Sequence, residues 1–184
     1  MTKRLACMAM MLCISGCATH QVIEKHEAVT DVSQLTAWSA QGRMGITGVP
    51  QAGSASFNWQ QLDATSQINL HGPLGVGAIS LLMDDTLHIT LSNGTHYDAE
   101  AALHELELRL GAAVPIKQLR FWLRGQAGPG DYQWIDENKV LQQDGWRIEY
   151  IDSMQVDAIQ LPKKITATHD AVRIRVVVEE WRLR

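Results

Sequence analysis

Hydrophobic and polar residues alternate along most of the chain from Trp38 onward, which predicts half-buried antiparallel strands. Before the middle of the chain the predicted strands lie at 38–46, 54–60, 68–70, 76–83 and 87–91. Ser92-Asn93-Gly94 then predicts a hairpin turn, because Asn-Gly suits a type I′ turn. Asn93-Gly94-Thr95 also matches a glycosylation sequon, but the turn is the preferred interpretation.

The period then changes to that of two short amphipathic helices. Over 99–110 the residues Leu103, Leu106 and Leu110 share one helical face, and Gly111 suits the position after the last helical residue. A second helix is predicted over 116–124, ending at Gly125. Each helix carries an apolar stripe that must cover another part of the protein.

Strands resume at Asp131, with predicted segments at 132–134, 140–141, 146–150, from 165 onward, and at 172–178. Leu161-Pro162 should interrupt pairing at an edge or a bulge, because proline has no amide hydrogen. Trp181 and Leu183 break the alternation of the last strand, which predicts a β-bulge near Glu179. Helices in the middle of an antiparallel meander predict a mainly β (α+β) fold, in which the sheet curls around an apolar interior.

The N-terminus has the pattern of a bacterial lipoprotein signal peptide. Lys3 and Arg4 precede an apolar run at 5–14, which is too short to span a bilayer. The segment Ile14-Ser15-Gly16-Cys17 resembles a lipobox, at which Cys17 would be lipidated and become the first mature residue. The alternative is a secretory signal that happens to contain a cysteine. Ala18, rather than aspartate, follows Cys17, which by similarity to lipoprotein sorting rules favours the bacterial outer membrane.

These features predict three regions. Residues 1–16 form the signal peptide, residues 17–34 the lipidated N-terminus and its tether, and residues 35–184 a single domain. All three cysteines lie within the first seventeen residues, so we expect no disulfide framework, thiolate metal site or cysteine nucleophile. The net charge of −4 gives no reason to expect a nucleic-acid partner.

The loop His71-Gly72-Pro73-Leu74-Gly75-Val76-Gly77 places a leucine where the chain must turn sharply. Proline fixes its own φ and glycine permits conformations closed to other residues, so this segment cannot be a central strand. Leu74 either folds back onto the core or points outward, toward a membrane or an apolar partner. Taken alone, the loop favours the first interpretation.

Catalytic and metal motifs are missing from the sequence. Neither His-Glu-x-x-His nor Gly-x-Ser-x-Gly occurs. His96 and Asp98 share a strand face, and we interpret them as a surface pair rather than a catalytic dyad. Asp84-Asp85 is better explained by a hairpin turn than by a metal site. We therefore expect no enzyme, no metal and no cofactor.

Several short motifs, in their order and spacing, resemble the LolB family of outer-membrane lipoproteins over nearly the whole mature chain. They are the lipobox at Cys17, Trp38 with Gly42-Arg43, Phe57-Asn58-Trp59-Gln60-Gln61, Gly72-Pro73-Leu74-Gly75, Pro115-Ile116 with Leu119, Trp122-Leu123-Arg124-Gly125, Gly145-Trp146 with Tyr150, Leu161-Pro162 and Trp181. The resemblance implies an open, incomplete antiparallel β-barrel of about ten or eleven strands, with a lid of short helices over a hydrophobic cavity.

The resemblance also implies a function. Such a protein receives lipoproteins from a LolA-like periplasmic carrier by binding their acyl chains, and inserts them into the outer membrane. Its partners would be the carrier, the acylated cargo and outer-membrane phospholipid. The loop formed by Gly72, Pro73, Leu74 and Gly75 would be the membrane-insertion loop, with Leu74 as its exposed apolar residue, which reverses the interpretation of the loop taken alone.

The residues expected to line the acyl cavity, chosen from strand and helix alternation, are Trp38, Met44, Phe57, Trp59, Ile68, Leu70 and Trp122. Core packing explains each of them nearly as well. We expect a periplasm-facing monomer. The alternatives are an outer-membrane lipoprotein that binds another apolar ligand, an envelope scaffold, or a lipid hydrolase, for which no nucleophile–base arrangement is evident.

Overall fold

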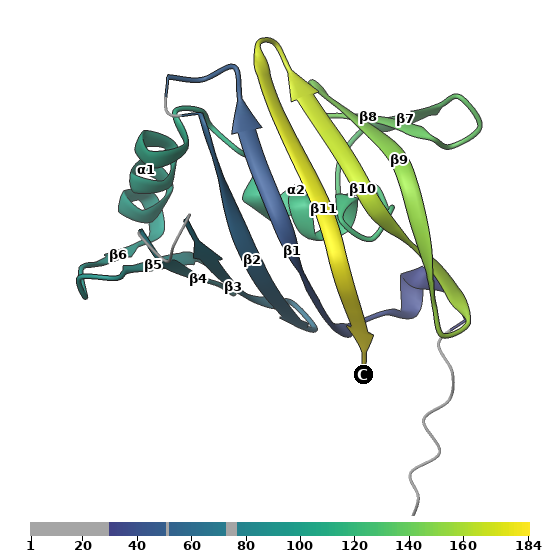
Figure 1. Cartoon of the computed structure of the whole chain (residues 1–184), viewed down its shortest axis with the longest axis horizontal. Helices are drawn as coiled ribbons and strands as arrows, with labels where there is room; N and C mark the ends of the chain where they lie inside the picture. Colours follow the sequence, from purple (N-terminus) through teal and green to yellow (C-terminus); the bar gives the residue numbers. More distant parts are fainter. Residues whose placement is uncertain (1–29, 51, 73–76) are drawn as a thin grey trace, which may run out of the picture.

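Eleven antiparallel strands form one continuous sheet in the computed structural model, which describes residues 30–50, 52–72 and 77–184 (Figure 1). The strands are β1 (Ala37–Thr47), β2 (Gly53–Leu62), β3 (Thr65–His71), β4 (Ile79–Met83), β5 (Leu87–Leu91), β6 (His96–Asp98), β7 (Tyr132–Ile135), β8 (Val140–Gln143), β9 (Trp146–Val156), β10 (Ile159–His169) and β11 (Val172–Leu183). A short 3₁₀ helix, η1 (Val32–Gln34), precedes β1.

The order of the strands leaves the barrel open. It runs β6-β5-β4-β3-β2-β1-β11-β10-β9-β8-β7, so the first and last strands of the chain pair at the centre. Within the described residues β6 and β7 form the two edges and do not meet. This confirms the prediction of a mainly β, open antiparallel sheet. The pairing of β1 with β11 joins the two meanders, β1 to β6 and β7 to β11, into one sheet. Local alternation could not predict this pairing, because the two strands are far apart in the sequence.

Two helices connect the halves of the sheet. In Figure 1, α1 (Ala99–Leu110) stands beside β2 near the β5–β6 edge, and α2 (Ile116–Trp122) lies behind the central strands. Gly111 has φ 70° and its N–H donates to the Glu107 carbonyl at 2.7 Å, which confirms it as the residue that ends α1. Within the described residues, no helix is long and apolar enough to cross a membrane.

The apolar face of α1 differs from the predicted one. Leu106 is buried as expected, but Leu103 is 48% exposed and Ala102 takes the buried position instead. Ala102, Leu106 and Leu110 follow one another at intervals of four residues, whereas Leu103 is rotated away from this line. The small side chain of Ala102 allows the first turns of α1 to lie close to the sheet.

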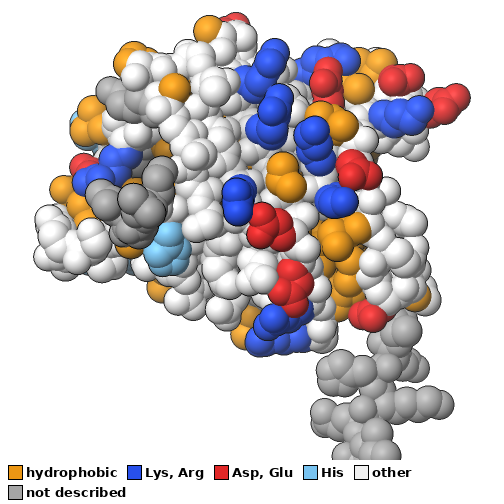
Figure 2. Space-filling model, in the orientation of Figure 1, with side chains coloured by type: hydrophobic (Ala, Val, Ile, Leu, Met, Phe, Trp, Pro, Cys, Tyr) orange, Lys and Arg blue, Asp and Glu red, His pale blue; other side chains and the backbone are white. Residues whose placement is uncertain are grey.

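A bulge in β11 keeps two large side chains on the core face. Gln41 pairs with Glu180 and Gly42 with Val178, so Glu179 has no partner in the ladder. Val178 and Trp181, three residues apart, are therefore both buried. The bulge predicted near Glu179 is confirmed. Glu179 is exposed and meets Arg43 at 3.2 Å. Figure 2 shows basic and acidic side chains gathered on the outer face of the central strands.

Leu161 and Pro162 interrupt the regular pairing at a bulge, as predicted, but they lie within a strand that was expected to begin only at 165. Strand β10 runs through them, and the register with β9 shifts at Lys163, beside the proline. β10 pairs with β11 only from Lys164 onward. The absence of an amide hydrogen at Pro162 therefore removes no hydrogen bond from the β10–β11 ladder. The Pro162 carbonyl accepts a hydrogen bond of 3.1 Å from the Trp181 indole instead.

Tryptophan side chains fill the core at the centre of the sheet. Trp38 is 1% exposed and lies between Trp59 and Trp181, with ring centroids 5.8 and 5.2 Å apart. These rings come from β1, β2 and β11, so they hold together the strands that join the two halves of the chain.

Candidate functional site: an apolar cavity between the sheet and its helices

A cavity of about 200 Å³ lies between the β1–β4 part of the sheet and both helices. Strands β1, β2, β3, β4 and β11 form one wall, and α1, α2 and the segment between them form the other. The lining residues are Met44, Gly45, Ile46, Gly53, Ser54, Ala55, Trp59, Ile68, Leu70, Leu81, Leu106, Arg109, Leu110, Val114, Ile116, Leu119 and Ile174.

The cavity wall is almost entirely apolar. Among the described lining residues, Arg109 is the one charged member and Ser54 the one hydroxyl. The Arg109 side chain is 39% exposed and donates from Nε to Glu105 Oε1 at 2.6 Å, one helical turn earlier on α1. A charged group at the rim and hydrocarbon within can accept an apolar guest with a polar end, because burying an unpaired polar group inside would be costly.

A second, much smaller cavity of about 20 Å³ adjoins the first. Met44, Trp59 and Leu119 line both, and Phe57, Leu123 and Val176 complete the smaller one. The apolar interior therefore continues along the inner face of β1 and β2 beneath α2.

The structure places the seven residues expected at an acyl cavity in three groups. Met44, Trp59, Ile68 and Leu70 line the main cavity, and Phe57 lines only the smaller one. Trp38 and Trp122 are among the lining residues of neither. Each of these two side chains is 1% exposed and packed against other aromatic rings, at 5.2 Å from Trp181 and 6.0 Å from Trp146 respectively.

The helical wall contains lining residues that were not predicted. Leu106 and Leu110 of α1, and Ile116 and Leu119 of α2, face the cavity. Their signal was present in the apolar stripes of both helices. The stripes did not show which strands the helices would cover. That depends on the pairing of β1 with β11, which are far apart in the sequence.

Buried polar contacts tie α2 to the sheet. The Trp122 indole donates to Gln143 Oε1 at 2.9 Å, and the same oxygen accepts from the Gly128 N–H at 2.9 Å. Gln143 is 2% exposed and its amide nitrogen donates to the carbonyls of Gly128 and Pro129 at 2.8 and 3.1 Å. Gln143 was not predicted as important; only its place at a core-facing position of β8 could have signalled it.

Arginines at the end of α2 add to this attachment. Arg120 Nη1 donates to the Ala64 carbonyl at 3.0 Å, and Arg124 Nη1 to the Leu35 carbonyl at 2.6 Å. Burial, together with the charge of Arg120, lowers the pKa of Arg124. Both helices bury two side chains, Ala102 and Leu106 in α1 and Ile116 and Trp122 in α2. The helices differ in their polar attachment, because the side-chain hydrogen bonds described above fasten α2, whereas the bond of Arg109 stays within α1.

The predicted membrane loop leaves the sheet beside the cavity. Pro73, Leu74 and Gly75 lie outside the described residues, as does Cys17. The ends of the loop are described: β3 ends at His71, β4 begins at Ile79, and Leu70 pairs with Ile79. Since Leu70 lines the cavity, this β3–β4 connection begins next to the cavity wall.

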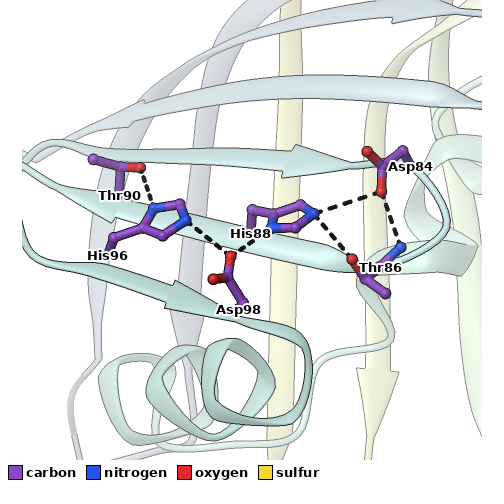
Figure 3. A network of polar contacts seen from close by, with 6 residues as sticks. All are labelled: Asp84, Thr86, His88, Thr90, His96 and Asp98. Atoms are coloured by element: carbon purple, nitrogen blue, oxygen red, sulfur yellow. Dashed lines mark hydrogen bonds and ion pairs between the residues drawn. The ribbon is translucent and has the colours of Figure 1, made fainter.

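His96 and Asp98 form the expected surface pair, and a third residue joins them. His96 Nε2 lies 2.8 Å from Asp98 Oδ1, and His88 Nδ1 on the neighbouring strand lies 2.5 Å from the same oxygen (Figure 3). The hydrogen bond to Asp98 raises the pKa of His88, and the same bond lowers the pKa of Asp98. The cluster lies outside the cavity and contributes no residue to its lining.

This geometry defines the chain as an open-barrel protein with an apolar interior closed by two helices. Comparison with known proteins gives the family. The model of the family described as "Outer membrane lipoprotein LolB" matches residues 36–181. The chain belongs to the LolB family of outer-membrane lipoproteins, which makes its role a non-enzymatic one.

Relatives with the same description align with this chain over most of their length. An outer-membrane lipoprotein LolB from Marinomonas sp. (strain MWYL1) is 30% identical over 193 residues, covering 100% of both chains. That of Chromohalobacter salexigens is 33% identical, covering 81% of this chain and 72% of the relative. That of Francisella tularensis subsp. tularensis (strain WY96-3418) is 30% identical, covering 99% and 97%.

Proposed function

We propose that this protein takes lipoproteins from a LolA-like carrier by holding their acyl chains in the apolar cavity, and then releases them into the outer membrane. The single observation that carries the proposal is the composition of the cavity wall. Fifteen of the seventeen described residues that line it are apolar or glycine, and the other two are Ser54 and Arg109. Such a wall suits hydrocarbon, and the rim arginine suits the polar end of the same molecule.

The cavity volume supports a closed resting state. At about 200 Å³ it is smaller than the roughly 300–1,000 Å³ typical of pockets for small ligands. It has room for part of an acyl chain but not for the several chains of a lipoprotein. Loading therefore requires one wall to move outward, and the sheet, held by its backbone ladder, is the wall less able to move.

We assign the movement to α1. Each helix buries two side chains, but α2 is held in addition by buried hydrogen bonds through Trp122 and Gln143. Fully burying an aliphatic side chain is worth about 1.5–3 kcal/mol. Displacing α1 thus costs the burial free energy of only a few side chains. Acyl chains that enter beside Leu106 and Leu110 would restore this burial with contacts of their own.

The anchor and the loop have separate tasks in this proposal. An acylated Cys17 would keep the protein on the outer membrane, since each buried methylene contributes about 0.8 kcal/mol. Burying Leu74 contributes roughly 1.5–3 kcal/mol, too little to matter for anchoring. It is enough to favour a brief contact between the β3–β4 connection and lipid while cargo leaves the neighbouring cavity.

A transfer assay tests the proposal. A LolA-like carrier loaded with an acylated lipoprotein is mixed with the purified protein, and then with phospholipid vesicles. We expect cargo to pass to the protein in the first step and to the vesicles in the second. Failure to accept cargo, together with normal binding of another apolar ligand, would favour the alternative of a lipoprotein with a different cargo. Cargo retained despite available vesicles would contradict the proposed release step.

A further inference from the structure

We propose that His88, His96 and Asp98 form a binding site for a divalent transition-metal ion of the zinc class, independent of the acyl cavity. The three side chains lie on one face of the β5–β6 edge of the sheet (Figure 3). One ligand atom from each lies within 4.8 Å of the others.

The strand ladder explains why these residues meet. His96 and Asp98 are two residues apart on β6, so their side chains project from the same face. His88 on β5 pairs directly with Asp98, and Thr90 pairs with His96. Directly opposed residues of an antiparallel pair have Cβ atoms about 4.5–5.5 Å apart, which allows short side chains to converge on one point.

The distances need little adjustment to admit an ion. Asp98 Oδ1 lies 2.5 Å from His88 Nδ1 and 2.8 Å from His96 Nε2. Zinc takes nitrogen and carboxylate ligands at about 2.0–2.2 Å in a tetrahedron, which places neighbouring ligand atoms a little over 3 Å apart. Rotating the exposed Asp98 carboxylate outward supplies that space, and solvent is free to fill the fourth position.

The far side of each imidazole already has a partner. His88 Nε2 lies 2.9 Å from Thr86 Oγ1 and 3.6 Å from Asp84 Oδ1, and His96 Nδ1 lies 3.0 Å from Thr90 Oγ1. Metal-bound histidines almost always donate their other N–H to such an acceptor, which fixes the ring and its tautomer. Here both outer nitrogens have acceptors, so both inner nitrogens can offer lone pairs toward the position beside Asp98.

Asp98 is also used in an unusual way for its place in the chain. It stands at the N-cap of α1, where an aspartate normally accepts hydrogen bonds from the first turn. Its side chain makes no such bond and turns to the two histidines instead. An ion held there would join β5 to the point where β6 becomes α1, and so would fasten the helix that forms one cavity wall.

Two nitrogens and one carboxylate favour zinc or its neighbours over magnesium and calcium, which prefer oxygen ligands.

The test is a titration of the purified full-length protein in detergent, without a polyhistidine tag and after treatment with EDTA. Calorimetry with ZnCl₂ should show one saturable site per chain, and the thermal midpoint should rise with zinc concentration. MgCl₂ should do neither. Added Co²⁺ should produce visible absorption bands of nitrogen coordination.

Two variants and one control locate the site. His88→Gln and His96→Gln should each weaken zinc binding by at least about tenfold, and the same rise in thermal midpoint should then need correspondingly more zinc. His104→Gln, which removes an exposed histidine of α1 outside the cluster, should bind like the parent protein. The proposal is overturned if the folded parent shows no saturable zinc binding below about 100 µM, or if both cluster variants, with unchanged midpoints in EDTA, bind zinc as tightly as the parent.

Discussion

Gly42 on β1 pairs with Val178 on β11 immediately beside the unpaired Glu179. The bulge brings the backbone of β11 so close that a Cβ atom on Gly42 would overlap the carbonyl oxygen of Val177. The glycine therefore allows the bulge, and the bulge allows Trp181 to join Trp38 in the core. This contact joins the two ends of the described domain.

Replacing Gly42 should test that relationship. We expect Gly42→Ala to lower the free energy of unfolding by about 3 kcal/mol, the upper end of the range for overpacking, because the new methyl meets backbone rather than a movable side chain. Urea unfolding measures this change in the free energy of unfolding. Gly45→Ala is the control on the same strand, where the nearest atom to a new Cβ is 3.5 Å away. Equal effects of the two variants would contradict this explanation.

Gln143 should matter more to stability than its neighbour on β8. Gln143→Leu leaves the buried Trp122 indole N–H and the Gly128 N–H without their acceptor. Each unsatisfied buried group costs about 1–3 kcal/mol, so we expect a loss of about 3 kcal/mol in thermal or urea unfolding. The exposed Gln142 supplies the control, and Gln142→Leu should change stability by less than about 0.5 kcal/mol.

Filling the cavity should block acyl binding without damage to the fold. Ala55 lines the main cavity from β2, whereas its neighbour Ser56 is exposed on the opposite face. Ala55→Phe should weaken binding of a fluorescent fatty acid by about tenfold or more, equal to at least about 1.4 kcal/mol. Ser56→Phe adds the same ring to the same strand and should bind normally. Loss of binding in both variants would point to the strand rather than to the cavity.

The β3–β4 connection should act at release rather than at binding. We expect Leu74→Glu to leave the free energy of unfolding within about 0.5 kcal/mol of the parent and to accept cargo from the carrier. Transfer of cargo into vesicles should slow by about tenfold or more, since the lost lipid contact is worth roughly 1.5–3 kcal/mol. Leu62→Glu, at a leucine 65% exposed at the end of β2, is the matched control. Normal insertion by Leu74→Glu would remove the role proposed for the loop.

Local alternation predicted the elements well where one face was buried. The strands around Phe57 and Trp59, the helix ending at Gly111 and the bulge at Glu179 all follow from short-range pattern. The irregularity expected at Pro162 is also present, but the strand begins at Ile159 rather than at 165, because a proline is tolerated within a strand wherever its neighbour does not need the amide hydrogen.

Alternation could not separate cavity wall from solid core. Met44 and Trp38 both occupy inward positions of β1, yet Met44 lines the cavity while Trp38 is enclosed by Trp59 and Trp181. The periodicity of a strand reports which face a side chain takes, and not whether another side chain fills the space opposite. That depends on the rings contributed by β2 and β11 and on how far α1 stands from the sheet.

The sequence by itself determined the elements, their apolar faces and the resemblance that led to the family, because each depends on residues close together in the chain. The tertiary structure decided which faces meet. Pairing of β1 with β11 placed the helices over the β1–β4 wall and left space between them, and pairing of β5 with β6 brought His88 to the His96–Asp98 pair. Contacts between distant segments arise from global packing, which local periodicity does not encode.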